Sequence, residues 1–142
     1  MKWIVAVVSV AESRPAFVEE EAVHRALYLA RHVGVRIQIV HTSSPESVDL
    51  VADARARGLR ATAEVCPHHL LLDLDDLVRL GPYGRCAPAL RPRELVEGMW
   101  ERVLDGTLDP SPVFDMEVDM EHVPDGYAAM DERRAIKVVV RA

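Results

Sequence analysis

The sequence is poor in cysteine, in aromatic residues and in positive charge. Its two cysteines, Cys66 and Cys86, form no CxxC pair and no disulfide framework. This usage is typical of free thiols in a reducing compartment, so we expect a cytoplasmic protein. The 17 lysines and arginines are outnumbered by 23 aspartates and glutamates, which gives a net charge of -6. Because a nucleic-acid-binding surface must neutralise phosphates, this balance argues against nucleic acid as a partner.

Hydrophobic runs long enough for a membrane are also missing. The apolar run from Trp3 to Val10 is far shorter than the roughly 20 residues that a membrane helix needs. A single lysine precedes it, and valine and isoleucine dominate it, which favours a buried first strand over a signal peptide. We therefore expect no membrane partner. The 142 residues, 49% hydrophobic and 28% charged, suit one globular domain with one core.

What the sequence contains is an alternation of strand-like and helix-like segments. Glycine and proline separate these segments, and Ser44 stands where a helix N-cap is expected, just before Pro45. We expect strands at 3–10, 35–41, 60–66, 113–118 and 136–141, and helices at 15–32, 45–57, 73–80, 93–104 and 123–132. The predicted fold is a single α/β domain over residues 1–142, with three layers and a mostly parallel sheet. The last strand is expected to be either parallel or an antiparallel edge.

Two of the expected helices carry apolar residues at intervals of three and four. In the first, this spacing predicts a buried face made of Val18, Ala22, Ala26, Leu29 and Val33. In the helix at 93–104, Trp100 shares a face with Val96, Val103 and Leu104. That stripe favours Trp100 as a core residue rather than a platform for a ligand.

The stretch "TAEVCPHHLLLD" carries the residue types of a metal site. Cys66, His68 and His69 follow an apolar strand, and zinc prefers sulfur and nitrogen ligands. On an extended chain adjacent histidines point to opposite sides, so only one of the pair is expected to face a metal. A four-ligand zinc site would need His41 and Cys86 as well. The favoured interpretation is a strand-to-loop turn with no metal, in which His41, His68 and Cys66 are at most vestigial ligands.

Residues 13–109 resemble the cyclic amidohydrolases, a family that includes hydantoinases, allantoinases and dihydroorotases. The resemblance lies in "IVHTSSPES", "EVCPHHLLLD", "APALR" and "GMWERVLDGTLD", in that order. It implies part of a TIM barrel about three times this length, with a two-metal centre at the strand ends. The family binds its metals through a His-x-His pair, a carboxylated lysine, two further histidines and an aspartate. Only His41 falls on one of these positions.

Other members of that ligand set have no counterpart in the sequence. There is no His-x-His, and Lys2 and Lys137 lie outside the matching region. Residues 110–142, ending in "GYAAMDERRAIKVVVR", resemble instead the C-terminus of zinc-containing medium-chain alcohol dehydrogenases. That family's glycine-rich cofactor turn is missing as well. These two resemblances predict a seam at 104–112 and a chimera made by recombination or by design.

The resulting functional prediction is a non-catalytic α/β chimera with no catalytic residues and no cofactor. One alternative is a weak metal-dependent hydrolase of cyclic amides, holding zinc through His41 and the "CPHH" turn. A second is a homo-oligomeric assembly module, because a piece of a barrel exposes strand edges that must be paired or covered. Self-association is therefore expected.

Overall fold

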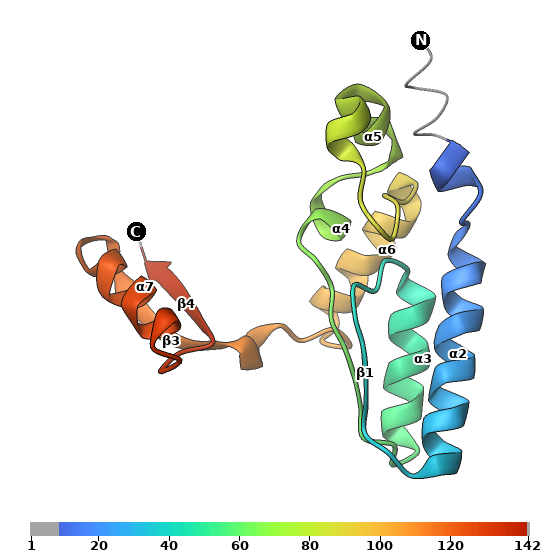
Figure 1. The fold of residues 1–142 in the computed structure, drawn as a ribbon, viewed down its shortest axis with the longest axis horizontal. Helices are drawn as coiled ribbons and strands as arrows, with labels where there is room; N and C mark the ends of the chain where they lie inside the picture. Colours follow the sequence, from blue (N-terminus) through green and yellow to red (C-terminus); the bar gives the residue numbers. More distant parts are fainter. Residues whose placement is uncertain (1–8, 142) are drawn as a thin grey trace. The chain divides into compact units, whose positions relative to one another are not determined.

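A computed structural model of the protein describes residues 9–141, and its contacts divide the chain into two compact units, residues 1–108 and 109–142 (Figure 1). Both units combine helices with parallel strands, so the predicted α/β character and parallel pairing are confirmed. The expected single sheet is not found in the described part of the chain, where four strands form two separate pairs. The alternation of strands and helices predicts single β-α-β units but not how many units share one sheet. In each pair, one helix connects the two parallel strands. The chain is therefore not clearly a single domain.

The first unit contains the elements α2 (Ala16–Val33), β1 (Ile37–Ile39), α3 (Pro45–Ala56), β2 (Ala61–Ala63), α4 (His68–Leu71), α5 (Leu74–Leu80), η1 (Gly81–Gly84) and α6 (Arg93–Leu104). β1 and β2 pair in parallel with Ile37 opposite Ala61, and α3 forms the crossover between them. Ser44 caps α3 as predicted, since its side chain accepts a hydrogen bond from the Ser47 amide. Both strands are shorter than predicted, at three residues each.

The predicted first strand, 3–10, lies almost entirely outside the described residues. Its last two positions, Ser9 and Val10, are helical. Among the described residues, no helix is both long and apolar enough to cross a bilayer. The cytoplasmic location and self-association stay predictions.

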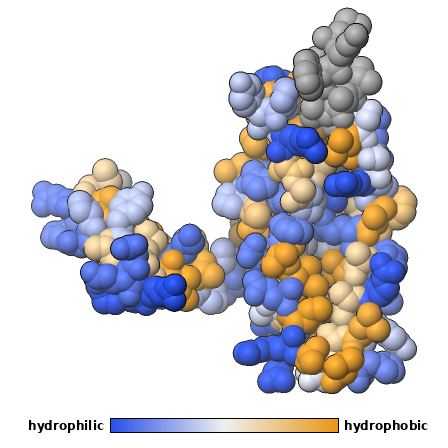
Figure 2. All heavy atoms as spheres, viewed as in Figure 1, coloured by the Kyte–Doolittle hydropathy of each residue, from blue (hydrophilic) through white to orange (hydrophobic). Residues whose placement is uncertain are grey.

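The core of the first unit lies between α2, α3 and the β1–β2 pair. Val23 and Leu27 of α2 pack there with Val51 and Ala61. The prediction of which face of α2 is buried was wrong, because Val18, Leu29 and Val33 of that face are all exposed. α2 has apolar residues on two sides, and Val23, Leu27 and Ala30 also recur at intervals of three and four. Periodicity identifies the helix but does not decide between two such stripes. Figure 2 shows apolar residues remaining on the surface of this unit.

The predicted core position of Trp100 in α6 was also wrong. Trp100 is 41% exposed, and its indole Nε1 donates to the Leu70 carbonyl over 2.7 Å. Met99 is fully buried in its place. The neighbouring Gly98 explains this orientation, because a Cβ there would stand 3.0 Å from Pro45 Cγ. α6 therefore approaches the start of α3 through its glycine side.

The second unit is a β-α-β arrangement with the elements η2 (Ser111–Val113), β3 (Phe114–Asp119), η3 (Met120–His122), α7 (Val123–Asp131) and β4 (Lys137–Arg141). The last strand is parallel to β3 rather than antiparallel. α7 approaches the pair closely, since a Cβ on Gly126 would lie 3.0 Å from Val138 Cγ1 and 3.4 Å from Val118 Cγ2. The segment positions predicted for α7 and β4 agree with the structure to within one residue.

Shortening Leu27 to alanine tests which stripe of α2 is the core. Leu27 is 6% exposed, so the substitution should lower the free energy of unfolding by about 2–5 kcal/mol through lost burial and a new cavity. Leu29→Ala is the matched control, because Leu29 is 54% exposed and its loss should change stability by about 0.5 kcal/mol or less. Urea unfolding followed by circular dichroism measures both. A larger loss for Leu29→Ala would contradict this packing.

Candidate functional site

Three side chains of types that can ligate a metal gather shortly after β2. The ligand atoms of Cys66, His68 and His69 all lie within 4.8 Å of one another, and we call these residues the Cys/His triad. Pro67 begins the short helix α4, which carries both histidines. The expectation that adjacent histidines diverge was therefore wrong, because it assumed an extended chain. The two imidazole centroids lie 4.3 Å apart, with their planes inclined by 56°.

His69 is the buried member of the triad. It is 2% exposed, and its Nε2 lies 3.1 Å from the Pro88 carbonyl oxygen. A carbonyl only accepts, so this hydrogen bond assigns the proton to Nε2 and leaves Nδ1 with a free lone pair. Nδ1 is buried and has no hydrogen-bond partner. Burial lowers the pKa of His69 more than the contact with Pro88 raises it, which favours the neutral ring.

Cys86, the fourth ligand of the zinc alternative, is engaged elsewhere. Its Sγ donates to the Pro88 carbonyl oxygen over 3.1 Å. Burial raises the pKa of the Cys86 thiol, and a protonated thiol is a poor ligand. Cys86 does not belong to the group of close donors formed by the triad.

His41 stands apart from the triad as well. It follows β1 in a left-handed conformation, with φ of 45°, and its side chain is exposed. Since β1 and β2 are parallel, His41 and Cys66 both follow the carboxyl ends of their strands. The group of close donors nevertheless includes only the triad among the described residues. Next to His41, Thr42 is buried and its Oγ1 has no partner.

The sequence did not indicate a largely buried ion pair that lies next to His41. The Glu19 carboxylate of α2 accepts hydrogen bonds from the Ser43 and Ser44 amides over 2.9 and 3.2 Å. Arg91 donates to Glu19 over 3.1 Å through Nη2, and to Ser43 Oγ over 2.9 Å through Nε. A third donor of Arg91, Nη1, reaches the Arg14 carbonyl over 2.6 Å. Glu19 and Arg91 lie 72 residues apart, and no periodicity pairs them.

The hydrogen bonds decide the charge of Glu19. Burial on its own raises the pKa of Glu19, but the donors from Ser43 and Arg91 outweigh it and the net pKa is lowered. Glu19 is therefore an ionised carboxylate that fixes the loop between β1 and α3. Because Ser43 lies two residues after His41, this ion pair also limits where His41 can lie.

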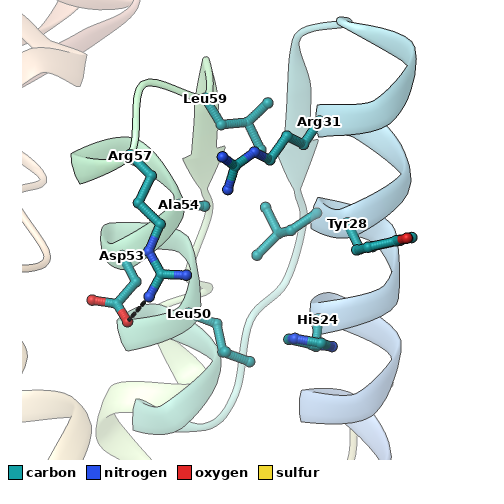
Figure 3. Close-up of a pocket in the computed structure, with 9 residues that line it drawn as sticks. His24, Tyr28, Arg31, Leu50, Asp53, Ala54, Arg57 and Leu59 are labelled. Atoms are coloured by element: carbon teal, nitrogen blue, oxygen red, sulfur yellow. Dashed lines mark ion pairs between the residues drawn. The ribbon is translucent and has the colours of Figure 1, made fainter.

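A separate hollow lies between α2 and α3 (Figure 3). Leu27, Leu50 and Leu59 supply its apolar wall, and Asp53 and Arg57 pair at its rim over 3.5 Å. None of the triad residues lines it. The triad and this hollow are therefore different surfaces.

Comparison with known proteins identifies relatives for about 70% of the chain. No family model matches the chain. It is 51% identical over 105 residues to the allantoinase of Rubrobacter xylanophilus, and 44% identical over 97 residues to that of Salmonella newport. These matches cover 70% and 68% of this chain but 23% and 21% of the relatives. Over that range the chain resembles the cyclic amidohydrolases. It spans about a fifth of the length of the curated relatives it matches.

Solved structures give the same result. The L-hydantoinase (dihydropyrimidinase) from Arthrobacter aurescens matches with a TM-score of 0.64 and 31% identity, covering 76% of this chain and 27% of that one. A D-hydantoinase matches with a TM-score of 0.62 and 38% identity, covering 70% and 22%. The resemblance found in the sequence of residues 13–109 is confirmed in this coarse form.

The prediction of a non-catalytic chimera was wrong. The named relatives are allantoinases and hydantoinases, so the comparisons favour the alternative of an amidohydrolase-like protein. They give no support to chimerism or to the resemblance of residues 110–142 to alcohol dehydrogenases. The missing family ligands do not imply inactivity, because the chain matches only a segment of each relative.

Neutralising Glu19 should weaken the fold in a pH-dependent way. The folded pKa of Glu19 lies below its usual 4.5, so its stabilising contribution is complete above that value and is lost as pH falls through the folded pKa. Glu19→Gln should cost about 1–3 kcal/mol near neutral pH, because buried donors lose a charged acceptor. The mutant should also lose less stability than wild type on acidification.

Urea unfolding between about pH 7 and pH 3 measures this difference. Glu21→Gln is the control, since Glu21 pairs with Arg25 at the exposed surface and the loss of this pair should cost about 0.5 kcal/mol or less. Parallel pH profiles for Glu19→Gln and wild type would contradict the role of Glu19.

Proposed function

We propose that this chain takes part in metal-dependent hydrolysis of a cyclic amide, as one segment of a hydrolase of the allantoinase and hydantoinase kind. The observation that carries the proposal is the 51% identity to an allantoinase over 105 residues. His41, the one position to which the resemblance assigns a metal ligand, lies in the resembling region. The names of the relatives suggest allantoin, hydantoin or a dihydropyrimidine as the substrate.

The local fold supports a fixed position for His41. The Thr42 amide donates to the Glu64 carbonyl over 2.8 Å, and the Glu64 amide donates to the Ile39 carbonyl over 2.8 Å. The segment around His41 is thus hydrogen-bonded to the chain beyond β2, while Glu19 holds Ser43, two residues after His41. Fixed ligand positions are what a hydrolytic metal centre requires of its scaffold.

The described residues do not fit a complete two-metal centre. Such a centre needs several ligands converging on each ion, and His41 is a single imidazole outside the Cys/His triad. The two lysines, Lys2 and Lys137, lie outside residues 13–109, the range whose sequence resembles the family. The proposal therefore assigns this chain one wall of a hydrolytic site and derives no chemical step through the family's metals.

Grafting residues 13–109 into the allantoinase of Rubrobacter xylanophilus, in place of the matching segment, tests the proposal. We expect the graft to hydrolyse allantoin. His41→Ala in the graft should lower kcat/KM more than about 100-fold, because even residues that only orient a metal ligand contribute about 10–100-fold. His32→Ala is the control, since His32 is exposed on α2.

Two results would refute this function. One is a folded graft with the parent's metal content and no turnover. The other is an active graft in which His41→Ala and His32→Ala behave alike.

A further inference from the structure

The Cys/His triad is a donor set that the resemblance to amidohydrolases leaves unexplained. The ligand position implied in this region is His41, which follows β1, whereas Cys66, His68 and His69 follow β2. The triad brings its donor atoms together without His41. The close grouping of these three donor atoms therefore needs an explanation other than the family's metal centre.

We propose that Cys66, His68 and His69 bind a single zinc-class divalent ion, separate from the family's two-metal centre. This inference goes beyond the proposed function and does not rest on it. One thiolate and two imidazoles form a mixed sulfur and nitrogen set, which selects a borderline ion such as zinc over magnesium or calcium, whose ligands are oxygens.

The buried imidazole supplies the second, independent observation. His69 is 98% buried, and its Nδ1 lone pair has no partner. Buried polar atoms are almost always paired, so an orphaned Nδ1 next to a thiol and a second imidazole indicates a missing partner that accepts electron pairs. A metal ion at the triad is such a partner.

Pro88 holds His69 in the orientation that the ion requires. Its carbonyl accepts from Nε2 over 3.1 Å, which fixes both the tautomer and the ring. Metal-binding histidines usually donate their other ring N–H to a carbonyl or carboxylate in this way. The Pro88 carbonyl therefore orients the His69 ring as a metal ligand is usually oriented, through the ring nitrogen that does not face the ion.

The other two ligands have room to adjust. Tetrahedral zinc places its ligand atoms about 3.3–3.7 Å apart, somewhat closer than the 4.8 Å limit within the triad. Cys66 and His68 are only half-buried, so rotation about their side-chain bonds can close the difference while His69 stays in place. The ion would be anchored by His69 and closed by the other two.

Three protein ligands leave a fourth position open. Closed structural zinc sites use four protein ligands, and sites with three keep water or a substrate in the fourth position. Cys86 does not fill it, because its thiol is bonded to the Pro88 carbonyl. The proposed site is therefore one that can bind an exogenous ligand.

Cobalt titration of the full chain, stripped of metal with a chelator, tests the site. One equivalent of Co2+ should produce a thiolate-to-cobalt charge-transfer band in the near ultraviolet, and zinc should displace it. Cys66→Ser should abolish the band, and Cys86→Ser, the matched control, should keep it. His68→Ala should weaken zinc binding at least about 10-fold, because even the loss of a residue that only orients a metal ligand costs about 10–100-fold.

His41→Ala separates this proposal from the proposed function. It should leave the cobalt band and zinc affinity unchanged, although it should inactivate the allantoinase graft. Loss of metal binding in His41→Ala would instead mean that His41 binds the ion, which would overturn the proposal of a site at the triad. Less than a tenth of an equivalent of bound metal, or an unchanged band in Cys66→Ser, would overturn it as well.

A measurement on the wild-type chain avoids any variant that fails to fold. Zinc should slow alkylation of Cys66 by iodoacetamide and leave the rate at Cys86 unchanged, as peptide mass spectrometry would show. Equal rates at Cys66 with and without zinc would contradict the proposal.

Discussion

The hydrogen bonds and the ion pair of the Glu19 carboxylate are the interactions on which the first unit depends most. It receives hydrogen bonds from the loop after β1 and from Arg91, which stands just before α6, and so joins α2 to two distant segments. Arg91 is buried and Glu19 largely so, and removing either side chain would leave the other as an uncompensated charge. Because this loop also carries His41, the position of the metal ligand proposed there depends on an ion pair in which His41 takes no part.

Local chemistry made most of the helices predictable. Ser44 before Pro45, Asp73 before α5 and Gly34 after α2 are capping residues, and each stands where the structure ends or begins a helix. Which face of a helix is buried depends on its neighbours. α2 carries two apolar stripes, and α6 is turned by the contact of Gly98 with Pro45, so neither orientation follows from periodicity.

The candidate site was predictable in its residue types and not in its geometry. Cys66 and His68 were identified because zinc prefers sulfur and nitrogen, and this inference needs only the sequence. His69 was set aside on the assumption of an extended chain, whereas α4 turns both imidazoles to the same side. The lone pair on Nδ1 is a property of burial and of the bond to Pro88, 19 residues away, and no local pattern contains it.

His41 and the Cys/His triad differ in which of their parts the surrounding structure fixes. This difference matches the two separate roles proposed for them. His41 is exposed, and backbone hydrogen bonds at Ile39 and Thr42 fix the chain on either side of it. His69 is buried, and its ring is fixed from within by Pro88. A metal centre built from several segments needs ligands that face outward from each segment, whereas an ion site within one segment needs at least one ligand that the same segment orients. Under the two proposals, His41 has the first arrangement and His69 the second. The carboxyl ends of β1 and β2 can therefore carry both proposed sites, His41 after β1 and the Cys/His triad after β2.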